Sequence, residues 1–302
     1  MVDFINLMEA RSLNIDSEND QDKFWHSDQW VMEPIYQGIR YQGLVYAPGK
    51  IKFHGKRKDY KEQNKVEQLS NIMSTLQSLN LPEQTLFECY LTFQNDRAKA
   101  FRFLKLEELD DDLRNNAQLF ITDIIYHNGQ DVCNIAFFDR RTILNKLFER
   151  AHGDYVTIQQ SFFKDKQKVF DSLKDEIKVF LFKDLAARYS FNKQSSSSRI
   201  YKVPQSYFMS IMGIVESSNK KLNKMIVALE GGQFKNGQLT KIMNIPVHSN
   251  DAREVLYNNK EQLLGKVFEF LATEKNENEG KYQEARFVKL RDDKKLEDCI
   301  FI

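Results

Sequence analysis

One stretch of this chain is rich in basic side chains, which could bind phosphate groups. Residues 50–65 contain seven lysines or arginines together with His54. Cations spaced in this way can follow a phosphate backbone through contacts that do not depend on base sequence. A charge run is also typical of a solvated hairpin and helix start, which is the commoner interpretation of such a run alone. The stretch is therefore compatible with a phosphate-binding surface and does not establish one.

Strands are expected on both sides of this stretch, because short apolar runs there are bounded by turn residues. Residues 30–47 and 50–53 are expected to form two strands joined by the turn Pro48-Gly49, with Ile35 near the end of the first. A turn at Asn128-Gly129 is expected within a later run. Three further strands are predicted, at 86–93, at 119–132 and, in the interior of a sheet, at 178–184.

Helices are predicted where apolar residues recur at three- and four-residue spacing. The amphipathic run at 62–79 gives the clearest pattern. Further helices are expected at 140–151 and 168–177, and a helical patch at Phe4, Ile5, Leu7 and Met8. The serine run Ser195–Ser198 is predicted to be a flexible segment that precedes a domain boundary.

After Val203-Pro204 the residue pattern of the chain changes to short runs rich in β-forming residues. Five such runs follow, and a helix-like segment at 250–264 precedes the fourth. Five strands with one helix of this kind suit a small β-barrel of the OB type. We therefore predict an α+β chain with two domains, residues 1–200 and an OB-fold domain over residues 205–302.

Length and composition agree with two domains and name no partner. A chain of 302 residues with 41% hydrophobic residues can fill two cores, and its net charge is only +1. Three widely spaced cysteines favour reduced thiols in an intracellular protein, with no disulfide framework and no zinc site. No signal core or run long enough to span a bilayer is present, so we expect no membrane partner.

The segment Glu33–Arg40 resembles the nucleophile motif of the covalent nucleotidyltransferases, the superfamily of ATP-dependent DNA ligases, RNA ligases and mRNA capping enzymes. In that family the motif reads Glu-x-Lys-x-Asp-Gly-x-Arg. Glu33, Gly38 and Arg40 fit, whereas Ile35 stands in place of the lysine and Gln37 in place of the aspartate.

The end of the chain resembles short viral-type DNA ligases more specifically. Gly265-Lys266 begins a strand, Arg286–Val288 follows a hairpin, and Arg291–Lys294 is similar to the sixth motif of the family. In the family the arginine and lysine of that motif orient the pyrophosphate of ATP. The resemblance therefore implies a nucleotidyltransferase (adenylation-like) domain in residues 1–200 and the OB-fold after it.

The motifs between these two ends are altered. Asp123, Asn128, Gly129 and either Arg140 or Arg141 fit the family, but Thr122 stands where an aromatic residue stacks on adenine. Tyr90 within Glu88–Leu91 replaces a glutamate, and Lys178 stands at a second glutamate position while Lys183 keeps a motif lysine. Lys202 is the first of two expected lysines, and Lys56-Arg57 offer a displaced arginine of the substrate loop.

The resemblance implies that the first chemical step is missing. Self-adenylation needs a lysine amine that attacks the α-phosphate of ATP, and isoleucine has no lone pair. Replacement of the motif carboxylates also removes hard oxygen ligands for magnesium. We therefore predict no catalytic residue, no metal site and no cofactor, with ATP and magnesium relevant only if the chain is an active ligase.

The expected function is that of a catalytically inactive DNA ligase-like protein that binds nucleic acid or serves as a subunit of a replication or repair assembly. Nicked or duplex DNA, or a hybrid, would be held through phosphate contacts. One alternative is an active ligase with a relocated lysine, for which Lys50 and Lys52 are the nearest candidates. A second is a protein-interaction scaffold. The predicted nucleic-acid-binding residues are Arg40, Lys56, Arg57, Lys183, Lys202, Arg291 and Lys294.

Overall fold

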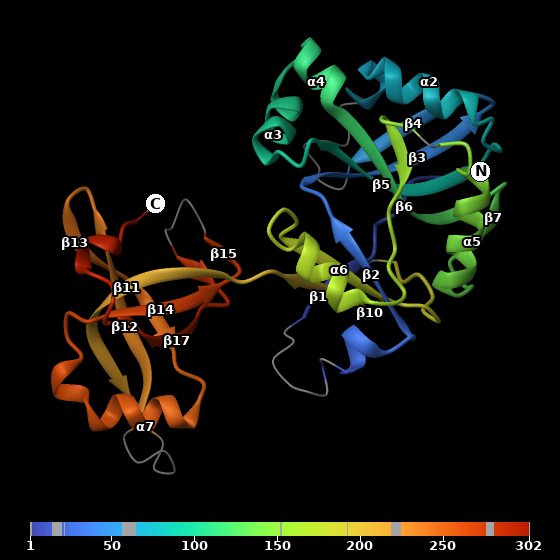
Figure 1. The fold of residues 1–302 in the computed structure, drawn as a ribbon. Helices are drawn as coiled ribbons and strands as arrows, with labels where there is room; N and C mark the ends of the chain where they lie inside the picture. Colours follow the sequence, from blue (N-terminus) through green and yellow to red (C-terminus); the bar gives the residue numbers. More distant parts are fainter. Residues whose placement is uncertain are drawn as a thin grey trace. The chain divides into compact units, whose positions relative to one another are not determined.

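The computed structural model of the chain divides into two compact units, Met1–Lys202 and Val203–Ile302 (Figure 1). The structure describes residues 2–13, 20, 22–55, 65–151, 153–191, 193–218, 225–275 and 281–301, without the side chain of residue 274. Within these residues no helix is both long and apolar enough to cross a lipid bilayer.

The first unit contains two sheets, and the smaller one carries the beginning of the nucleophile-like motif, Glu33–Ile35. Its strand order is β1-β10-β9-β2, in which β1 runs parallel to β10 and the other neighbours are antiparallel. The bounds are Glu9–Ser12 for β1, Trp30–Ile35 for β2, Val179–Asp184 for β9 and Gln194–Lys202 for β10. The predicted strand at 178–184 is confirmed as an interior strand, because β9 lies between β10 and β2.

The larger sheet of this unit follows the order β4-β3-β5-β6-β7, and β8 pairs with β6 in parallel. Its strands are β3 (Gly38–Ala47), β4 (Lys50–Gly55), β5 (Thr85–Phe93), β6 (Ala117–His127), β7 (Gln130–Asp131) and β8 (Val156–Ile158). The helices in the described part of the unit are α2 (Ser70–Ser78), α3 (Arg97–Lys105), α4 (Asp111–Asn116), α5 (Phe137–Leu147) and α6 (Lys166–Leu173), with a π-turn at Asp22–His26 and a 3-10 turn at Lys65–Gln68.

Burial explains why these segments fold as they do. On α2 the predicted apolar stripe points inward, with Ile72 and Leu76 buried in the same core cluster as Phe87 and Leu91 of β5. Strand β5 is buried along nearly its whole length because it is central in the sheet. The turns at Pro48-Gly49 and Asn128-Gly129 are confirmed, and both glycines have positive φ.

Three expectations for this unit are wrong in detail. The run 30–47 forms two strands in different sheets, because Tyr36-Gln37 interrupts the strand between β2 and β3. The expected helical patch is extended instead, since the buried Gln42 side chain takes both main-chain hydrogen bonds of Ile5. Ser195–Ser198 belongs to β10, where backbone pairing with β1 and β9 holds it.

The second unit has the five strands and the helix that its sequence predicts. Its sheet order is β13-β12-β11-β14-β17, all antiparallel, which is an OB-like arrangement. The strands are β11 (Gln205–Glu216), β12 (Ile226–Lys235), β13 (Gln238–Pro246), β14 (Val267–Ala272) and β17 (Arg286–Leu290), with α7 (Asn250–Asn258) and a short pair β15 (Glu274–Lys275) and β16 (Tyr282–Gln283). Two 3-10 turns lie at Lys260–Gln262 and Leu296–Asp298.

Candidate functional site

Ile35 is the last residue of β2 and lines a small cavity of the first unit. Its register partner on β9 is Val179, which in turn pairs with Lys202 on β10. The side chain is half-buried among groups from several elements. The cavity is lined by Met8, Ala10, Ile35, Arg40, Glu88, Tyr90, Asp123, Leu181, Lys183, Tyr189, Ser198 and Ile200.

Arg40 reaches this cavity from β3 and forms an ion pair inside the unit. Its Nε donates to Glu88 Oε1 at 2.6 Å, and its Nη1 donates to the main-chain oxygen of Met8 at 2.8 Å. Burial alone would lower the pKa of Arg40, but the Glu88 carboxylate, together with Tyr90 and Tyr189, raises it above its usual value. The guanidinium is therefore a permanent cation that is already neutralised locally.

Glu33 and Lys183 form a second buried pair beside the first. Lys183 Nζ lies 3.0 Å from Glu33 Oε2, and the Ser161 hydroxyl donates to Glu33 Oε1 at 2.6 Å. Both Glu33 and Lys183 are buried. Arg141 Nη1 lies 3.7 Å from the same carboxylate. The retained motif lysine is thus committed to a neighbouring carboxylate.

The sequence left Arg140 and Arg141 as equivalent matches, and the structure separates their roles. Arg140 forms a two-pronged bond to Asp123, with Nε–Oδ1 at 2.9 Å and Nη2–Oδ2 at 3.0 Å. Both side chains are at most 3% exposed. Arg141 instead donates to the main-chain oxygen of Gln159. Arg140 is therefore the partner of the motif aspartate.

Thr122 stands where the family has an aromatic residue that stacks on adenine, and its side chain has a different role here. The Thr122 hydroxyl donates to the main-chain oxygen of Glu88 at 3.2 Å, which ties β6 to β5. Phe120, two residues earlier on β6, stacks on Tyr36 with ring centroids 4.5 Å apart. Tyr90 does line the cavity, and burial raises the pKa of its hydroxyl, so it is neutral there.

Sequence reasoning missed Tyr189 and the segment around Met8. The Tyr189 hydroxyl donates to Glu88 Oε2 at 2.9 Å and accepts the main-chain N–H of Met8 at 3.1 Å. No spacing rule connects Met8 to Tyr189, which lies 181 positions later. The sequence shows only an apolar run at Phe4–Met8. The spacing of its apolar residues does not indicate which part of the fold the run packs against.

The cavity does not fit ATP as it stands. Its volume is about 50 Å³, and Met8 and Ala10 form part of its wall. Pockets for drug-sized ligands have volumes of roughly 300–1,000 Å³. Space for about one or two waters remains at roughly 30 Å³ each. Among the described residues, no group of three or more His, Cys, Asp or Glu is arranged to hold a metal ion.

The two lysines expected as relocated nucleophiles lie elsewhere. Lys50 and Lys52 are exposed residues of β4, the edge strand of the larger sheet, and neither lines the Ile35 cavity. Lys52 Nζ lies 4.7 Å from the centre of the Tyr46 ring. The lysine that does line the cavity is Lys183.

The remaining predicted basic residues fall in three places. Lys202 is half-buried at the end of β10, and Lys56 and Arg57 lie outside the described residues. In the second unit Arg291 forms ion pairs with Glu269 at 2.8 Å and with Asp293 at 2.6 Å. Lys294 Nζ lies 5.1 Å from the centre of the Phe208 ring. Contact of these residues with nucleic acid stays a prediction.

The two units define the class of protein: a nucleotidyltransferase fold of the α+β type followed by an OB-fold. Within this class the chain has the fold of ATP-dependent DNA ligases. The ligase domain of LigD from M. tuberculosis aligns with a TM-score of 0.54 and 15% identity over 98% of each chain. The ATP-dependent DNA ligase of bacteriophage T7, in complex with ATP, aligns with a TM-score of 0.51 and 14% identity over 95% of this chain and 98% of that one.

A third solved structure agrees with these two. A Lig E DNA ligase aligns with a TM-score of 0.52 and 14% identity over 96% of this chain and 100% of that one. No protein-family model matches the sequence, and no curated protein matches it. The shared property is therefore the fold.

Proposed function

We propose that this chain is a ligase-fold protein that binds nucleic acid and does not form a nucleotidyl intermediate. The observation that carries the proposal is Ile35, which stands at the end of β2 where the resemblance requires a nucleophilic lysine. The cavity beside it has a volume of about 50 Å³, which supports the same conclusion because a nucleotide needs several times that space.

The carboxylates around the cavity support a structural role for the retained motif residues. Glu88 and Asp123 each bond to an arginine of the same unit. A carboxylate held by a guanidinium is a poor magnesium ligand, because the cation would have to displace its partner. The residues kept from the motifs therefore stabilise the fold of the first unit.

Intact-mass measurement after incubation with ATP or GTP and magnesium tests the catalytic half of the proposal. We expect no mass shift. A covalent nucleotidyl adduct would instead favour an active ligase with a relocated lysine, for which Lys183 is the cavity-lining candidate. Peptide mapping of the adduct, and its absence in Lys183→Arg, would then identify the nucleophile.

Binding to nicked duplex DNA in a salt series tests the other half. An electrostatic phosphate binder loses affinity linearly in log–log coordinates as salt rises. Intact duplex and RNA–DNA hybrid of the same length serve as comparison substrates. Absence of binding at low salt would favour the protein-interaction scaffold. An assembly role in repair or replication is a proposal of the same kind, to be tested by isolating complexes from the native source.

A further inference from the structure

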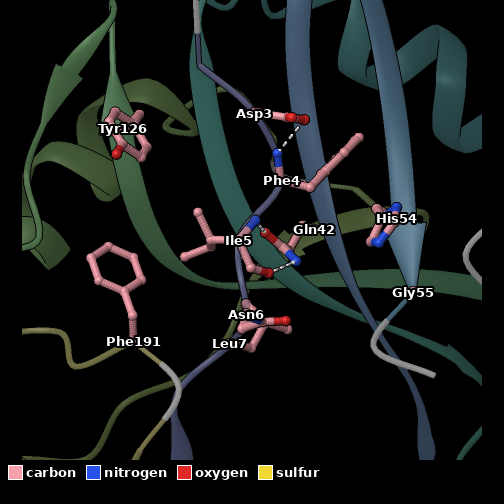
Figure 2. A pocket seen from close by; sticks show the side chains of 10 residues that line it. All are labelled: Asp3, Phe4, Ile5, Asn6, Leu7, Gln42, His54, Gly55, Tyr126 and Phe191. Carbon is pink, nitrogen blue, oxygen red and sulfur yellow. Dashed lines mark hydrogen bonds between the residues drawn. The ribbon is translucent and has the colours of Figure 1, made fainter. Parts of the chain in front are cut away.

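Residues 2–12 lie extended across the first unit, and they are held mainly through their backbone. The Ile5 N–H donates to Gln42 Oε1 at 3.0 Å, and Gln42 Nε2 donates back to the Ile5 carbonyl at 2.6 Å (Figure 2). Gln42 is only 1% exposed with the segment in place. One side chain thus satisfies both polar groups of one peptide residue.

Met8 is held in a similar way, by hydrogen bonds to both its N–H and its carbonyl. Its N–H donates to the Tyr189 hydroxyl and its carbonyl accepts from Arg40, while Tyr189 and Arg40 share the Glu88 carboxylate. Three residues after Ile5, the main chain is therefore again bonded by one side-chain donor and one side-chain acceptor. Backbone contacts of this type do not depend on the side chain of the residue they hold.

Beyond Met8 the segment adds a strand to a sheet edge. Strand β1 pairs in parallel with β10 at the edge of the smaller sheet, from Glu9 opposite Gln194 to Ser12 opposite Ile200. The next residue continues the contact, because the Leu13 N–H donates to the Ile200 carbonyl at 2.7 Å. Strand addition to an exposed edge is a standard mode of peptide recognition.

The side chains of the segment enter apolar and aromatic contacts. Leu7 and Met8 are buried in a cluster with Leu86, Ile125 and Cys133. Phe4 stacks on His54 with ring centroids 4.7 Å apart. Alongside Phe4 and Ile5 lies a pocket of about 500 Å³, lined also by His54, Tyr126 and Phe191 (Figure 2).

We propose that this face of the first unit is a binding site for an extended apolar peptide, and that residues 2–12 are its ligand in cis. The proposal does not depend on nucleic-acid binding. It accounts for the small Ile35 cavity, because Met8 and Ala10 contribute to its wall. It also gives Arg40 and Tyr189 a ligand, which is the main chain of Met8.

Cys133 provides a reporter, because its thiol is buried in the same cluster as Leu7 and Met8. In the full chain, Leu7→Asp should release the segment, since an unpaired carboxylate is costly to bury. We expect alkylation of Cys133 to accelerate by at least about tenfold through local opening. The matched control is Asn6→Asp, which places the same side chain at an exposed position and should leave the rate unchanged.

A synthetic peptide of residues 2–12, added to the Leu7→Asp chain, should restore slow alkylation in a saturable manner. The same peptide carrying Leu7→Asp should not. Cys89, buried in the main core, is the internal reference. The proposal is overturned if Cys133 does not accelerate, if Cys89 accelerates in parallel, or if the peptide gives no protection. A wild-type rate that falls with chain concentration would overturn the assignment in cis, because the segment would then come from a second copy.

Discussion

Around Ile35, three cations of the first unit are each paired with a carboxylate of the same unit. Arg40 bonds to Glu88, and Arg140 bonds to Asp123. Lys183 completes the set through Glu33. A phosphate that replaced one of these carboxylates would leave a buried negative charge behind, which is expensive. At the scale of residues, the site is built as an internal ion-pair cluster.

The Arg140–Asp123 pair gives the sharpest test at this scale. We expect Arg140→Met to lower the free energy of unfolding of the first unit by roughly 3–5 kcal/mol, because it strands a buried carboxylate. The matched control is Arg114→Met, since Arg114 and Asp111 form an exposed pair at 3.5 Å that should contribute less than about 1 kcal/mol. Urea denaturation followed by circular dichroism measures both. Equal effects of the two changes would contradict the assigned role.

The motif positions predicted this cluster only in part. Glu33, Arg40 and Asp123 all fit motifs of the family. The structure places Arg40 and Asp123 in the wall of the Ile35 cavity, and it pairs Glu33 with Lys183 of the same wall. The choice of Arg140 over Arg141 depends on which face of α5 points to β6, and adjacent residues differ there by about 100° of helix rotation. Tyr189 was invisible because its partners are distant in sequence.

At the scale of elements, Gly38 shows that a motif residue can persist for packing. A Cβ atom at Gly38 would lie 2.3 Å from the main-chain oxygen of Leu91 on the neighbouring strand β5. The backbone oxygen cannot rotate away as a side chain could. The close approach of β3 to β5 therefore requires glycine at the first residue of β3.

We expect Gly38→Ala to destabilise the first unit by about 1–3 kcal/mol, because β3 must shift away from β5. The matched control is Gly153→Ala, where no atom lies within 4 Å of the added Cβ and φ is ordinary. That change should be neutral or stabilising by roughly 0.4–1 kcal/mol. Thermal and urea unfolding of both variants would decide. An unaffected Gly38→Ala chain would contradict the packing explanation.

Most elements were predictable because their patterns are local. The apolar period gave α2, and the turn residues gave the hairpin at Pro48-Gly49. The pattern failed where long-range pairing decides the outcome. Ser195–Ser198 has the composition of a linker, yet β1 and β9 supply partners for its backbone on both sides. Residues 4–8 have a helical period, yet the side chains of Arg40 and Gln42 on β3 hold them extended.

For the molecule as a whole, the net charge of +1 means that attraction to nucleic acid depends on local contacts. Seven basic residues are predicted to contact phosphates. If all seven did so, the plot of log affinity against log salt would have a slope of about −6. The internal pairs of Arg40 and Lys183 remove two contacts, which predicts a slope of about −4 to −5 instead.

Among these predicted phosphate contacts, Lys294 is the best one to remove singly. Its amine lies over the Phe208 ring, so its replacement leaves no buried charge without a partner. Lys294→Ala should weaken binding to nicked, intact and hybrid duplexes alike and should reduce the slope by about 1. Lys146→Ala, at an exposed position on α5, is the matched control and should change neither value. Electrophoretic mobility shifts over a salt series give both quantities. Because a phosphate contact reads no bases, a loss confined to one substrate would contradict a phosphate role for Lys294 and indicate recognition of duplex shape.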